Sequence, residues 1–493
     1  MLRDLFLKQE CQKRLAVIEG ENSVTLDKLV QKAKDIQFCL PQNQWSNAVI
    51  FLPDGSDFIA AIFGIFLLGK TAFPLNVHLT PGEIMPLLEQ ADAHIMITSY
   101  RFRSVCDEVM VSMPSLQVIY TEECKEQRSM PLLYECCVEL DLPMLLLTTS
   151  GSTGNAKLVP LTERNLETCV YGYMDRMCYE DMKETEIRYL LATPFSSAYG
   201  LMILFACMIK GFPLIVLTED FTLDTFYQAV QDHKVTHYEG GALVLLMMEQ
   251  TARRPIPYDI HLLKYLGFGG SRISGETLRA LLKKHPGIQL WQGYGMTEAA
   301  PLITKYSKTT SDKLDSVGRA IDGVTLLIES DGVISDTPYI NGEILVKGTN
   351  VMLGYYKNEA ETEKVLKNDC LYTGDLGYLD EDGYLYINGR RKNVIIVRGF
   401  NVYPEEVEGC ILNSLLVKDC VVYGEMDTQG NEIVCADIIL ADTTAEHVEI
   451  LQEIRLYCKE NLSDFKQPQR IRAVDNIKKT VAGKHVRKRE VRL

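Results

Sequence analysis

A run of glycine and hydroxyl residues follows an apolar segment in the first third of the chain. It consists of Thr148-Thr149-Ser150-Gly151-Ser152-Thr153-Gly154-Asn155-Ala156-Lys157, after the strand-like Met144–Thr148. Glycine lets a backbone approach a ligand closely, and main-chain N–H groups and hydroxyls can donate hydrogen bonds to phosphate oxygens. Lys157 adds a cation, but it stands between Ala156 and Leu158, which excludes a Walker loop. We predict a phosphate-binding loop over Thr149–Lys157, in preference to a flexible surface turn.

A second run, Gly293-Tyr294-Gly295-Met296-Thr297-Glu298, follows the strand-like Ile288–Trp291. Its glycines flank an aromatic ring on which a flat ligand can stack. Thr297 and Glu298 add hard oxygen ligands of the kind that Mg²⁺ prefers. The alternative for a single acidic loop residue is a solvated side chain without a role.

The third run is Tyr372-Thr373-Gly374-Asp375-Leu376-Gly377, and Gly389-Arg390-Arg391-Lys392 follows it. The carboxylate of Asp375 can accept hydrogen bonds from both hydroxyls of a ribose, and Arg390 can brace the same nucleotide. The alternative is a plain turn, since Asp between glycines is a common turn residue.

The fourth run, Lys479-Thr480-Val481-Ala482-Gly483-Lys484, lies in a basic tail of an otherwise acidic chain. Taken alone it predicts only a solvated tail, because a block of like charges is usually an exposed segment.

Apolar β-rich runs alternate with helical runs through the first two-thirds of the chain. The strand-like runs are Asn47–Leu52, Ala93–Thr98, Met144–Thr148 and Pro213–Thr218, and the helical ones are Asp57–Leu68, Pro81–Glu89, Leu161–Arg176 and Leu223–His233. This alternation is typical of largely parallel sheets with helices on their faces. We predict an α/β fold with a large N-terminal domain of mixed or parallel sheets.

After residue 310 short strands are joined by Gly- and Asp-rich turns. The runs Gly323–Glu329, Gly342–Val346, Tyr372–Tyr378 and Gly383–Ile387 predict a small antiparallel β-subdomain over residues 310–390. Beyond it, helices Pro404–Ile411 and Ala445–Asn461 with strands Asp419–Tyr423 and Glu432–Leu440 predict a small α+β domain. We place the boundary in the polar run Gly389–Lys392, which gives domains 1–391 and 392–493.

The overall charge of the chain narrows the classes of partner. The 493 residues include 51 Lys and Arg and 66 Asp and Glu, so the formal charge is 51 − 66 = −15. This length exceeds what one hydrophobic core usually serves, which favours two or more domains. A strongly acidic surface argues against nucleic acid as a partner and disfavours anionic membranes.

The cysteines and the apolar runs indicate a soluble protein of a reducing compartment. No pair among the 14 cysteines has Cys-x-x-Cys spacing, and no secretory signal opens the chain. Phe58–Leu68 is too short to span a bilayer, and Lys210, Gly211 and Pro213 interrupt Leu201–Leu217. We expect no transmembrane segment, reduced thiols and a cytoplasmic location.

Taken together and in this order, the four runs resemble the adenylate-forming superfamily of acyl-CoA synthetases, adenylation domains and luciferases. The resemblance covers nearly the whole chain and includes Gly269–Ser271, Gly342–Ile344, Gly354–Tyr356 and Gly399–Glu408. It implies an ATP- and Mg²⁺-dependent enzyme that activates a carboxylic acid as an acyl-adenylate, releases pyrophosphate and passes the acyl group to a thiol. It also implies that residues 1–391 form an AMP-binding domain and residues 392–493 a mobile C-terminal domain.

The resemblance implies a role for each matching position. Thr149, Ser150, Gly151, Ser152, Thr153, Gly154 and Lys157 would bind the β- and γ-phosphates, Ser271, Arg272, Tyr294 and Gly295 the adenine, and Asp375 and Arg390 the ribose. Thr297 and Glu298 would position phosphate and Mg²⁺. Lys392 would be the hinge, and Lys484 would bridge the acid and the α-phosphate. The thiol would enter beside Gly399.

Two positions depart from the patterns of the family and bear on the acid. Ala198 stands where adenylation domains for α-amino acids carry an Asp, which disfavours an α-amino acid. Ser197 stands where many acyl- and aryl-CoA ligases carry a His. We expect a fatty or aryl acid and assign no role to Tyr238 or Glu239. The expected acyl pocket combines small and apolar residues, namely Ala198, Tyr199, Gly240, Gly241, Gly269, Pro301 and Leu302.

Three functions are compatible with the sequence. The first is an acid–thiol ligase with CoA as acceptor. The second, favoured by the missing His, is a stand-alone adenylation enzyme that loads the phosphopantetheine of a separate acyl or peptidyl carrier protein. The third is a nucleotide-binding protein without ligase activity, against which the retention of Lys484, Glu298, Asp375 and Arg390 counts.

Overall fold

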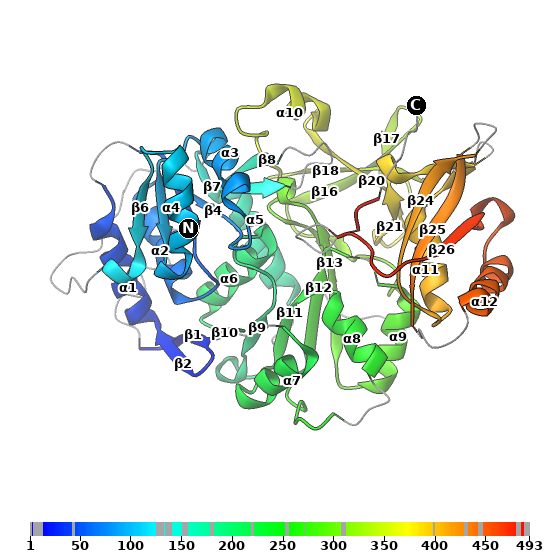
Figure 1. Ribbon diagram of the computed structural model, residues 1–493, viewed down its shortest axis with the longest axis horizontal. Helices are drawn as coiled ribbons and strands as arrows, with labels where there is room; N and C mark the ends of the chain where they lie inside the picture. Colours follow the sequence, from blue (N-terminus) through cyan, green and yellow to red (C-terminus); the bar gives the residue numbers. More distant parts are fainter. Residues whose placement is uncertain are drawn as a thin grey trace. The chain divides into compact units, whose positions relative to one another are not determined.

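The computed structural model separates the chain into two compact units (Figure 1). The first contains Met1–Thr325 and Val346–Leu371, and the second contains Leu326–Leu345 and Tyr372–Leu493. The structure describes residues 2, 13–41, 45–124, 133, 141–149, 156–177, 182–217, 221–251, 256–271, 273–306, 312–397, 400–427, 432–441, 447–479 and 485–487. The predicted boundary after residue 391 stays a prediction.

The first unit contains a six-stranded sheet with the order β6-β5-β3-β4-β7-β8. Its strands are β3 (Asn47–Phe51), β4 (Thr71–Pro74), β5 (Ile95–Thr98), β6 (Gln117–Tyr120), β7 (Pro143–Thr149) and β8 (Lys157–Thr162). Neighbours are parallel except β7 and β8. Helices α2 (Ser56–Leu67), α3 (Pro81–Ala91) and α4 (Arg103–Ser112) follow β3, β4 and β5. The predicted alternation of strand and helix is confirmed.

The first unit also contains a nine-stranded sheet with the order β15-β14-β13-β12-β11-β9-β10-β1-β2. Its strands are β1 (Leu15–Glu19), β2 (Asn22–Thr25), β9 (Tyr189–Leu191), β10 (Leu214–Val216), β11 (His237–Gly241), β12 (Tyr265–Gly269), β13 (Gln289–Gly295), β14 (Leu302–Lys305) and β15 (Arg319–Ala320). The neighbours from β1 through to β13 are parallel, and β2, β14 and β15 add antiparallel edges.

Helices cover both faces of the nine-stranded sheet. On one face α5 (Glu163–Arg176) and α6 (Ala198–Lys210) share a core with α1 (Leu26–Cys39), α2 and the six-stranded sheet. On the other face α7 (Leu223–Asp232), α8 (Leu243–Thr251) and α9 (Gly275–Lys284) form a separate core. The strands between these layers are buried on both sides, which explains their continuous apolar sequences.

Local sequence sets the ends of the central helices. The Ser197 hydroxyl accepts a hydrogen bond of 3.0 Å from the Gly200 N–H and caps α6, and Gly211 ends that helix at φ +70°. The predicted start of α5 at Leu161 is two residues early, because β8 continues to Thr162. The Thr162 side chain then caps α5 by accepting a bond from the Asn165 N–H. Pro160 lies in β8, an edge strand where its missing N–H costs no ladder bond.

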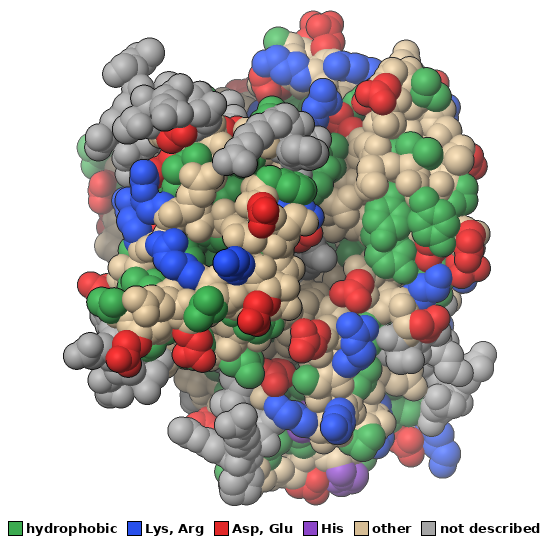
Figure 2. All heavy atoms as spheres, turned by 90° about the vertical axis from the view of Figure 1, so that its right-hand side faces the viewer, with side chains coloured by type: hydrophobic (Ala, Val, Ile, Leu, Met, Phe, Trp, Pro, Cys, Tyr) green, Lys and Arg blue, Asp and Glu red, His purple; other side chains and the backbone are tan. Residues whose placement is uncertain are grey.

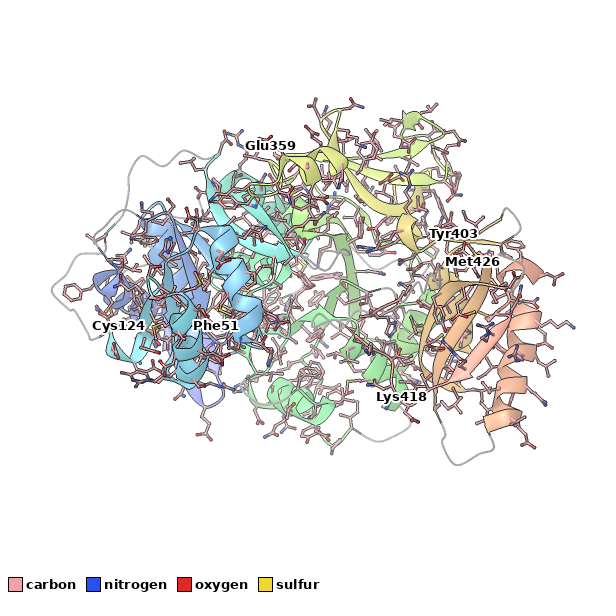
Figure 3. The ribbon with its side chains drawn as sticks, turned by 45° about the horizontal axis from the view of Figure 1, so that its top comes forward. Phe51, Cys124, Glu359, Tyr403, Lys418 and Met426 are labelled. Carbon is pink, nitrogen blue, oxygen red and sulfur yellow. The ribbon has the colours of Figure 1, made fainter. Side chains whose placement is uncertain are left out.

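A second six-stranded sheet has the order β17-β16-β18-β20-β19, with β21 beside β20. Its strands are β16 (Val324–Ser330), β17 (Val333–Ser335), β18 (Gly342–Gly348), β19 (Leu366–Lys367), β20 (Cys370–Leu379) and β21 (Leu385–Arg390). The β16–β17, β19–β20 and β20–β21 pairs are antiparallel hairpins, as predicted for the β-rich segment. Helix α10 (Glu359–Val365) precedes β19, and its first residue, Glu359, is labelled in Figure 3.

The C-terminal part of the second unit has its own core. It contains the hairpin β22 (Ile395–Val397) and β23 (Phe400–Val402), helices α11 (Pro404–Asn413) and α12 (His447–Asn461), and the sheet of β24 (Val417–Met426), β25 (Glu432–Leu440) and β26 (Arg470–Ala473). Apolar residues of both helices and of these strands form one cluster. Tyr403, labelled in Figure 3, directly precedes α11.

Three observations concern the cellular environment of the protein. Within the described ranges, no helix combines the length and apolarity that crossing a membrane requires. The cysteines that the structure describes form no disulfide. On the face shown in Figure 2, acidic and basic side chains are interspersed among the described residues.

Candidate active site

The carboxyl ends of three neighbouring parallel strands carry the predicted adenine and acyl residues. Gly241 at the end of β11 pairs with Gly269 at the end of β12, and β13 ends next to them at Gly295. Ligands of α/β proteins bind at this edge of the sheet. The structure therefore brings Gly240, Gly241, Gly269, Tyr294 and Gly295 to one edge.

The backbone at this edge requires glycine at two positions. A Cβ on Gly295 would lie 1.7 Å from the carbonyl oxygen of Pro301, and Gly270 has φ +78°. Gly295 therefore lets the backbone pass close to Pro301, and Gly270 allows a left-handed backbone just before Ser271. Tyr294 is partly exposed at the end of β13, and Ser271 is exposed. Arg272, the other residue predicted to bind adenine, lies outside the described residues.

Glu298 is held in a short 3₁₀ turn, Thr297–Ala299, that follows β13. Its side chain is buried, and its Oε1 accepts a hydrogen bond of 2.9 Å from the Tyr355 hydroxyl. Burial, with the Glu298 charge, raises the pKa of Tyr355, so this hydroxyl stays a donor at neutral pH. The Met352 N–H also donates to the backbone oxygen of Glu298 at 2.9 Å. One hydrogen bond thus holds the carboxylate of Glu298 and another holds its backbone.

Lys157 lies beside the same tyrosine. Its ammonium stands 4.7 Å from the centre of the Tyr355 ring and forms an ion pair with Glu361 of α10. Hydrogen bonds from Lys157 and then Lys364 lower the pKa of Glu361 to about 2. Tyr355 therefore joins the predicted phosphate lysine to Glu298, a contact that the sequence does not predict. Thr149, the last residue of β7, pairs in register with Lys157, whereas Ser150–Gly154 lie outside the described residues.

The residues around Glu298 suit a magnesium ion held jointly with a nucleotide. Among the described residues there is no cluster of three or more His, Cys, Asp or Glu side chains that could hold a metal alone. Mg²⁺ usually takes one or two carboxylates, and substrate phosphates and water complete its shell. One buried carboxylate next to the Thr297 hydroxyl fits that arrangement.

In the second unit, Asp375 of β20 and Arg390 of β21 lie opposite each other in register. Arg390 Nε is 2.9 Å from Asp375 Oδ1. The turn before Asp375 is fixed by the Thr373 hydroxyl, which donates to the Ile344 carbonyl at 2.8 Å, and by the Gly374 N–H, which donates to Glu343 at 3.0 Å. The structure thus brings the two predicted ribose residues together on a rigid hairpin.

Three predicted residues of the second unit have little or no structural description. Lys392 is exposed in a 3₁₀ turn, Arg391–Asn393, between β21 and β22. Gly399 and Lys484 lie outside the described residues. The described residue after Lys484, His485, forms an ion pair with Asp419 at 2.9 Å.

One of the predicted acyl residues, Tyr199, contacts a charged group to which the sequence assigns no role. Ala198 and Tyr199 begin α6, and Pro301 and Leu302 lead into β14. The Tyr199 hydroxyl donates to Glu239, the β11 residue that precedes Gly240. Ala198 and Leu302 are buried, in accord with an apolar lining.

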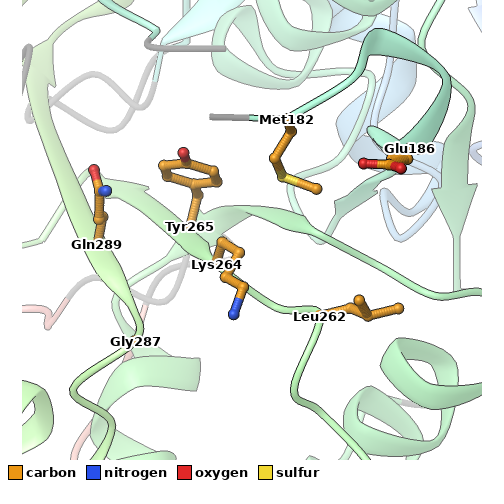
Figure 4. A pocket seen from close by; sticks show the side chains of 7 residues that line it. All are labelled: Met182, Glu186, Leu262, Lys264, Tyr265, Gly287 and Gln289. Atoms are coloured by element: carbon orange, nitrogen blue, oxygen red, sulfur yellow. The ribbon is translucent and has the colours of Figure 1, made fainter. Parts of the chain in front are cut away.

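A hollow of about 290 Å³ lies elsewhere on the nine-stranded sheet (Figure 4). Its lining includes Lys264, Tyr265 and Gln289, at the amino ends of β12 and β13. Figure 4 shows Met182 and Glu186 on its other side. Because substrates of parallel α/β sheets bind at the carboxyl ends, this hollow is separate from the candidate site.

Comparisons with known proteins agree with this geometry. A family model described as "AMP-binding enzyme" matches residues 8–356, and one described as "AMP-binding enzyme C-terminal domain" matches residues 406–484. The chain is 30% identical over 480 residues to 2-succinylbenzoate–CoA ligase from Bacillus subtilis, covering 96% of this chain and 94% of the relative.

Solved structures of a Bacillus subtilis enzyme share the fold along almost the whole chain. The o-succinylbenzoate CoA synthetase in complex with its acyl-adenylate intermediate has a TM-score of 0.85 at 29% identity, covering 97% of this chain and 96% of that one. The same enzyme in complex with ATP and magnesium ion has a TM-score of 0.82 at 28% identity, covering 98% and 97%. The chain therefore belongs to the AMP-binding enzymes of the adenylate-forming superfamily, and it is an AMP-forming acid–thiol ligase.

Proposed function

We propose that the chain joins an acyl or aryl acid, and not an α-amino acid, to CoA. The observation that supports this proposal is that Lys157 and Glu298 both contact Tyr355, so the cation proposed to bind phosphate lies near the carboxylate proposed to hold Mg²⁺. CoA is favoured over a carrier protein because the relatives named above are CoA ligases. The cysteines within the described ranges form no disulfide, which supports a reducing, cytoplasmic location.

Each residue predicted to bind the nucleotide or Mg²⁺ has a task in the first step. The loop Thr149–Lys157 binds the β- and γ-phosphates, and Ser271, Arg272, Tyr294 and Gly295 hold the adenine. The Asp375 carboxylate accepts hydrogen bonds from the ribose hydroxyls, and Arg390 orients that carboxylate. Glu298, with Thr297, holds Mg²⁺, which neutralises phosphate charge when bound.

The chemistry needs charge compensation rather than a base. The acid attacks the α-phosphate as a carboxylate, so it is already a nucleophile, and pyrophosphate leaves with added negative charge. Lys157 and the N–H groups of its loop stabilise that charge where it develops. Lys484 serves the same purpose between the acid and the α-phosphate.

The second step uses the C-terminal domain, residues 392–493. We propose that it turns at Lys392, withdraws Lys484 and admits the thiol beside Gly399. The thiolate attacks the acyl carbon, the acyl–phosphate bond breaks and AMP leaves. Lys484→Ala is therefore expected to reduce adenylation strongly and transfer from preformed acyl-adenylate much less.

Exchange of labelled pyrophosphate into ATP, run over a panel of acids, tests the proposal. Exchange that depends on a fatty or aryl acid supports it, and exchange driven best by an amino acid would overturn the assignment of Ala198. Formation of acyl-CoA, compared with acylation of a phosphopantetheinyl carrier protein, then identifies the acceptor. Binding of ATP without any acid-dependent exchange would indicate a nucleotide-binding protein instead.

A further inference from the structure

An ion pair is buried beneath the strand ends where the acyl group is proposed to bind. Lys305 Nζ lies 3.2 Å from Glu239 Oε1, and each side chain is only 1% exposed. The Tyr173 hydroxyl donates to the same carboxylate oxygen at 2.7 Å, and the Tyr199 hydroxyl donates to the other. The Lys305 ammonium also stands 4.4 Å from the centre of the Tyr173 ring. The carboxylate is therefore surrounded by donors from α5, α6 and β14.

The register of the sheet places Glu239 on the same face as two of the proposed acyl residues, Gly241 and Gly269. Glu239 pairs with Gly267, and Gly241, two residues further along the same strand, pairs with Gly269. Residues two apart in a strand point to the same face. Lys305 faces Gly293 across the β13–β14 pair. The side chains of Glu239 and Lys305 thus meet over strands whose nearest residues are glycines.

Gly267 is the residue that makes room for the carboxylate. A Cβ at this position would lie 2.1 Å from Glu239 Cδ and 2.2 Å from both carboxylate oxygens. The sheet surface between the two charged residues is therefore formed by backbone atoms. The Glu239 carboxylate occupies the space that a side chain from β12 would fill.

Below the ion pair, the same face is closed by rings. His237 stacks between Tyr189 and Tyr265 at centroid distances of 4.6 and 4.5 Å, and Tyr265 stacks on Trp291 at 4.4 Å. Burial lowers the pKa of His237 to about 3, so this row carries no charge at neutral pH. From the strand ends inward, a substrate therefore meets glycines, then the ion pair, then a closed aromatic layer.

A buried ion pair is not by itself a source of stability, although removing one partner alone is costly. Replacing a buried ion pair by apolar residues of similar size is often neutral or stabilising, because both charges lose their hydration. A charged pair at the end of a substrate site instead selects substrates by the charge that they carry. A second carboxylate on the acid would be brought against Glu239, whose counter-charge is already used by Lys305.

We propose that Glu239, held by Lys305 and Tyr199, is a specificity-determining residue that closes the acyl site and excludes acids carrying a second negative charge. The substrate is then a short acyl or aryl monocarboxylic acid with an uncharged tail. This inference rests on the proposed ligase function and deepens it. It also separates this chain from the relatives, whose 2-succinylbenzoate is a dicarboxylate.

Matched pairs of acids test the proposal on the full-length enzyme. We expect kcat/KM for acyl-CoA formation to be about 100-fold lower for adipate than for hexanoate, and for terephthalate than for benzoate, because burying an unpaired charge costs several kcal/mol and each tenfold is 1.4 kcal/mol. In Glu239→Gln these ratios should narrow at least about tenfold, as the anion is removed while Lys305 stays. Glu408→Gln, which changes a buried carboxylate paired with Arg487 in the other unit, should leave the ratios unchanged.

A double variant and the substrate range of the wild type separate a failure of this inference from a failure of the variant to fold. If Glu239→Gln unfolds with an unpaired lysine, the neutral double variant Glu239→Gln/Lys305→Met should fold and also narrow the ratios. A wild-type enzyme that uses adipate or 2-succinylbenzoate as well as hexanoate or benzoate would overturn the inference and leave the ligase function standing. Absence of exchange with every acid would overturn the proposed function instead.

Discussion

Two lysine–glutamate pairs in the first unit differ in how far they are removed from water. Lys305 and Glu239 are each 1% exposed, whereas the side chains of Lys157 and Glu361 are 19% and 25% exposed. Desolvation lowers the pKa of Lys305, and Glu239 opposes that effect, so the buried pair depends on both partners staying in place. The pair of Lys157 and Glu361, the outer pair, can exchange partners, because water or a phosphate can replace the carboxylate. A fixed pair suits the shaping of a site, and an exchangeable pair suits the binding of a charged substrate.

Breaking the buried pair should have the largest effect, and the effect should be on folding. Lys305→Ala leaves Glu239 buried without its counter-charge, which typically costs about 3–5 kcal/mol in the free energy of unfolding. Urea and thermal unfolding measure it. The double variant Lys305→Met/Glu239→Gln should recover most of the loss. A single variant as stable as the wild type would show that water reaches this pair.

Breaking the outer pair on the lysine side should affect catalysis more than folding. Lys157→Ala is expected to lower kcat/KM for ATP by about 10²–10³, the scale of losing one charge-stabilising group. The stability of this variant should change little, because water reaches the pair and can solvate Glu361 once the lysine is gone. Pyrophosphate exchange and thermal unfolding, measured on one preparation, separate the two effects. A loss of stability matching that of Lys305→Ala would contradict the comparison.

The two pairs also differ in how far the sequence predicts them. Lys157 follows a glycine- and hydroxyl-rich run, and Asp375 and Arg390 lie in short motifs, so local spacing is enough to select them. Glu239 and Lys305 are separated by 66 residues, and neither lies in a motif. Only the register of β11 to β14 brings them together, and the order of strands in a sheet is not encoded in local spacing.

Tyr355 shows the same limit within a recognised motif. The run Gly354–Tyr356 supports the resemblance to the superfamily, but its sequence does not indicate a partner. The contact with Glu298 spans 57 residues and depends on the fold of the first unit. The strand and helix alternation was predicted well because long apolar runs carry it, whereas β8 was missed because Pro160 interrupts its pattern.

Tyr355 allows the contribution of the carboxylate to be separated from that of the lysine. Tyr355→Phe removes the hydrogen bond to Glu298 but keeps the ring beside Lys157. A hydrogen bond to a charged group contributes about 1.5 kcal/mol or more, so the Mg²⁺ concentration for half-maximal exchange should rise about tenfold. The KM for ATP at saturating Mg²⁺ should stay within about twofold of the wild type. A change only in the KM for ATP would show that Tyr355 acts through Lys157 and not through Glu298.

The smallest effect is expected from Glu361→Gln, which removes the carboxylate that competes with phosphate for Lys157. Because water reaches this pair, its contribution is small, and the KM for ATP should fall by no more than about fivefold, with kcat unchanged. The folded-state pKa of Glu361 is lowered to about 2, so the stabilisation from this pair is complete above the ordinary carboxyl pKa of 4.5 and is lost as pH falls from there toward 2. Between pH 5 and 8 the wild-type carboxylate is therefore charged throughout, and the advantage of the variant should be the same across that range.

Initial rates over an ATP titration at several pH values check this, with Glu363→Gln on the same helix as the matched control. A KM that rises in Glu361→Gln would mean that the glutamate positions Lys157 for ATP, and the outer pair would then resemble the buried one.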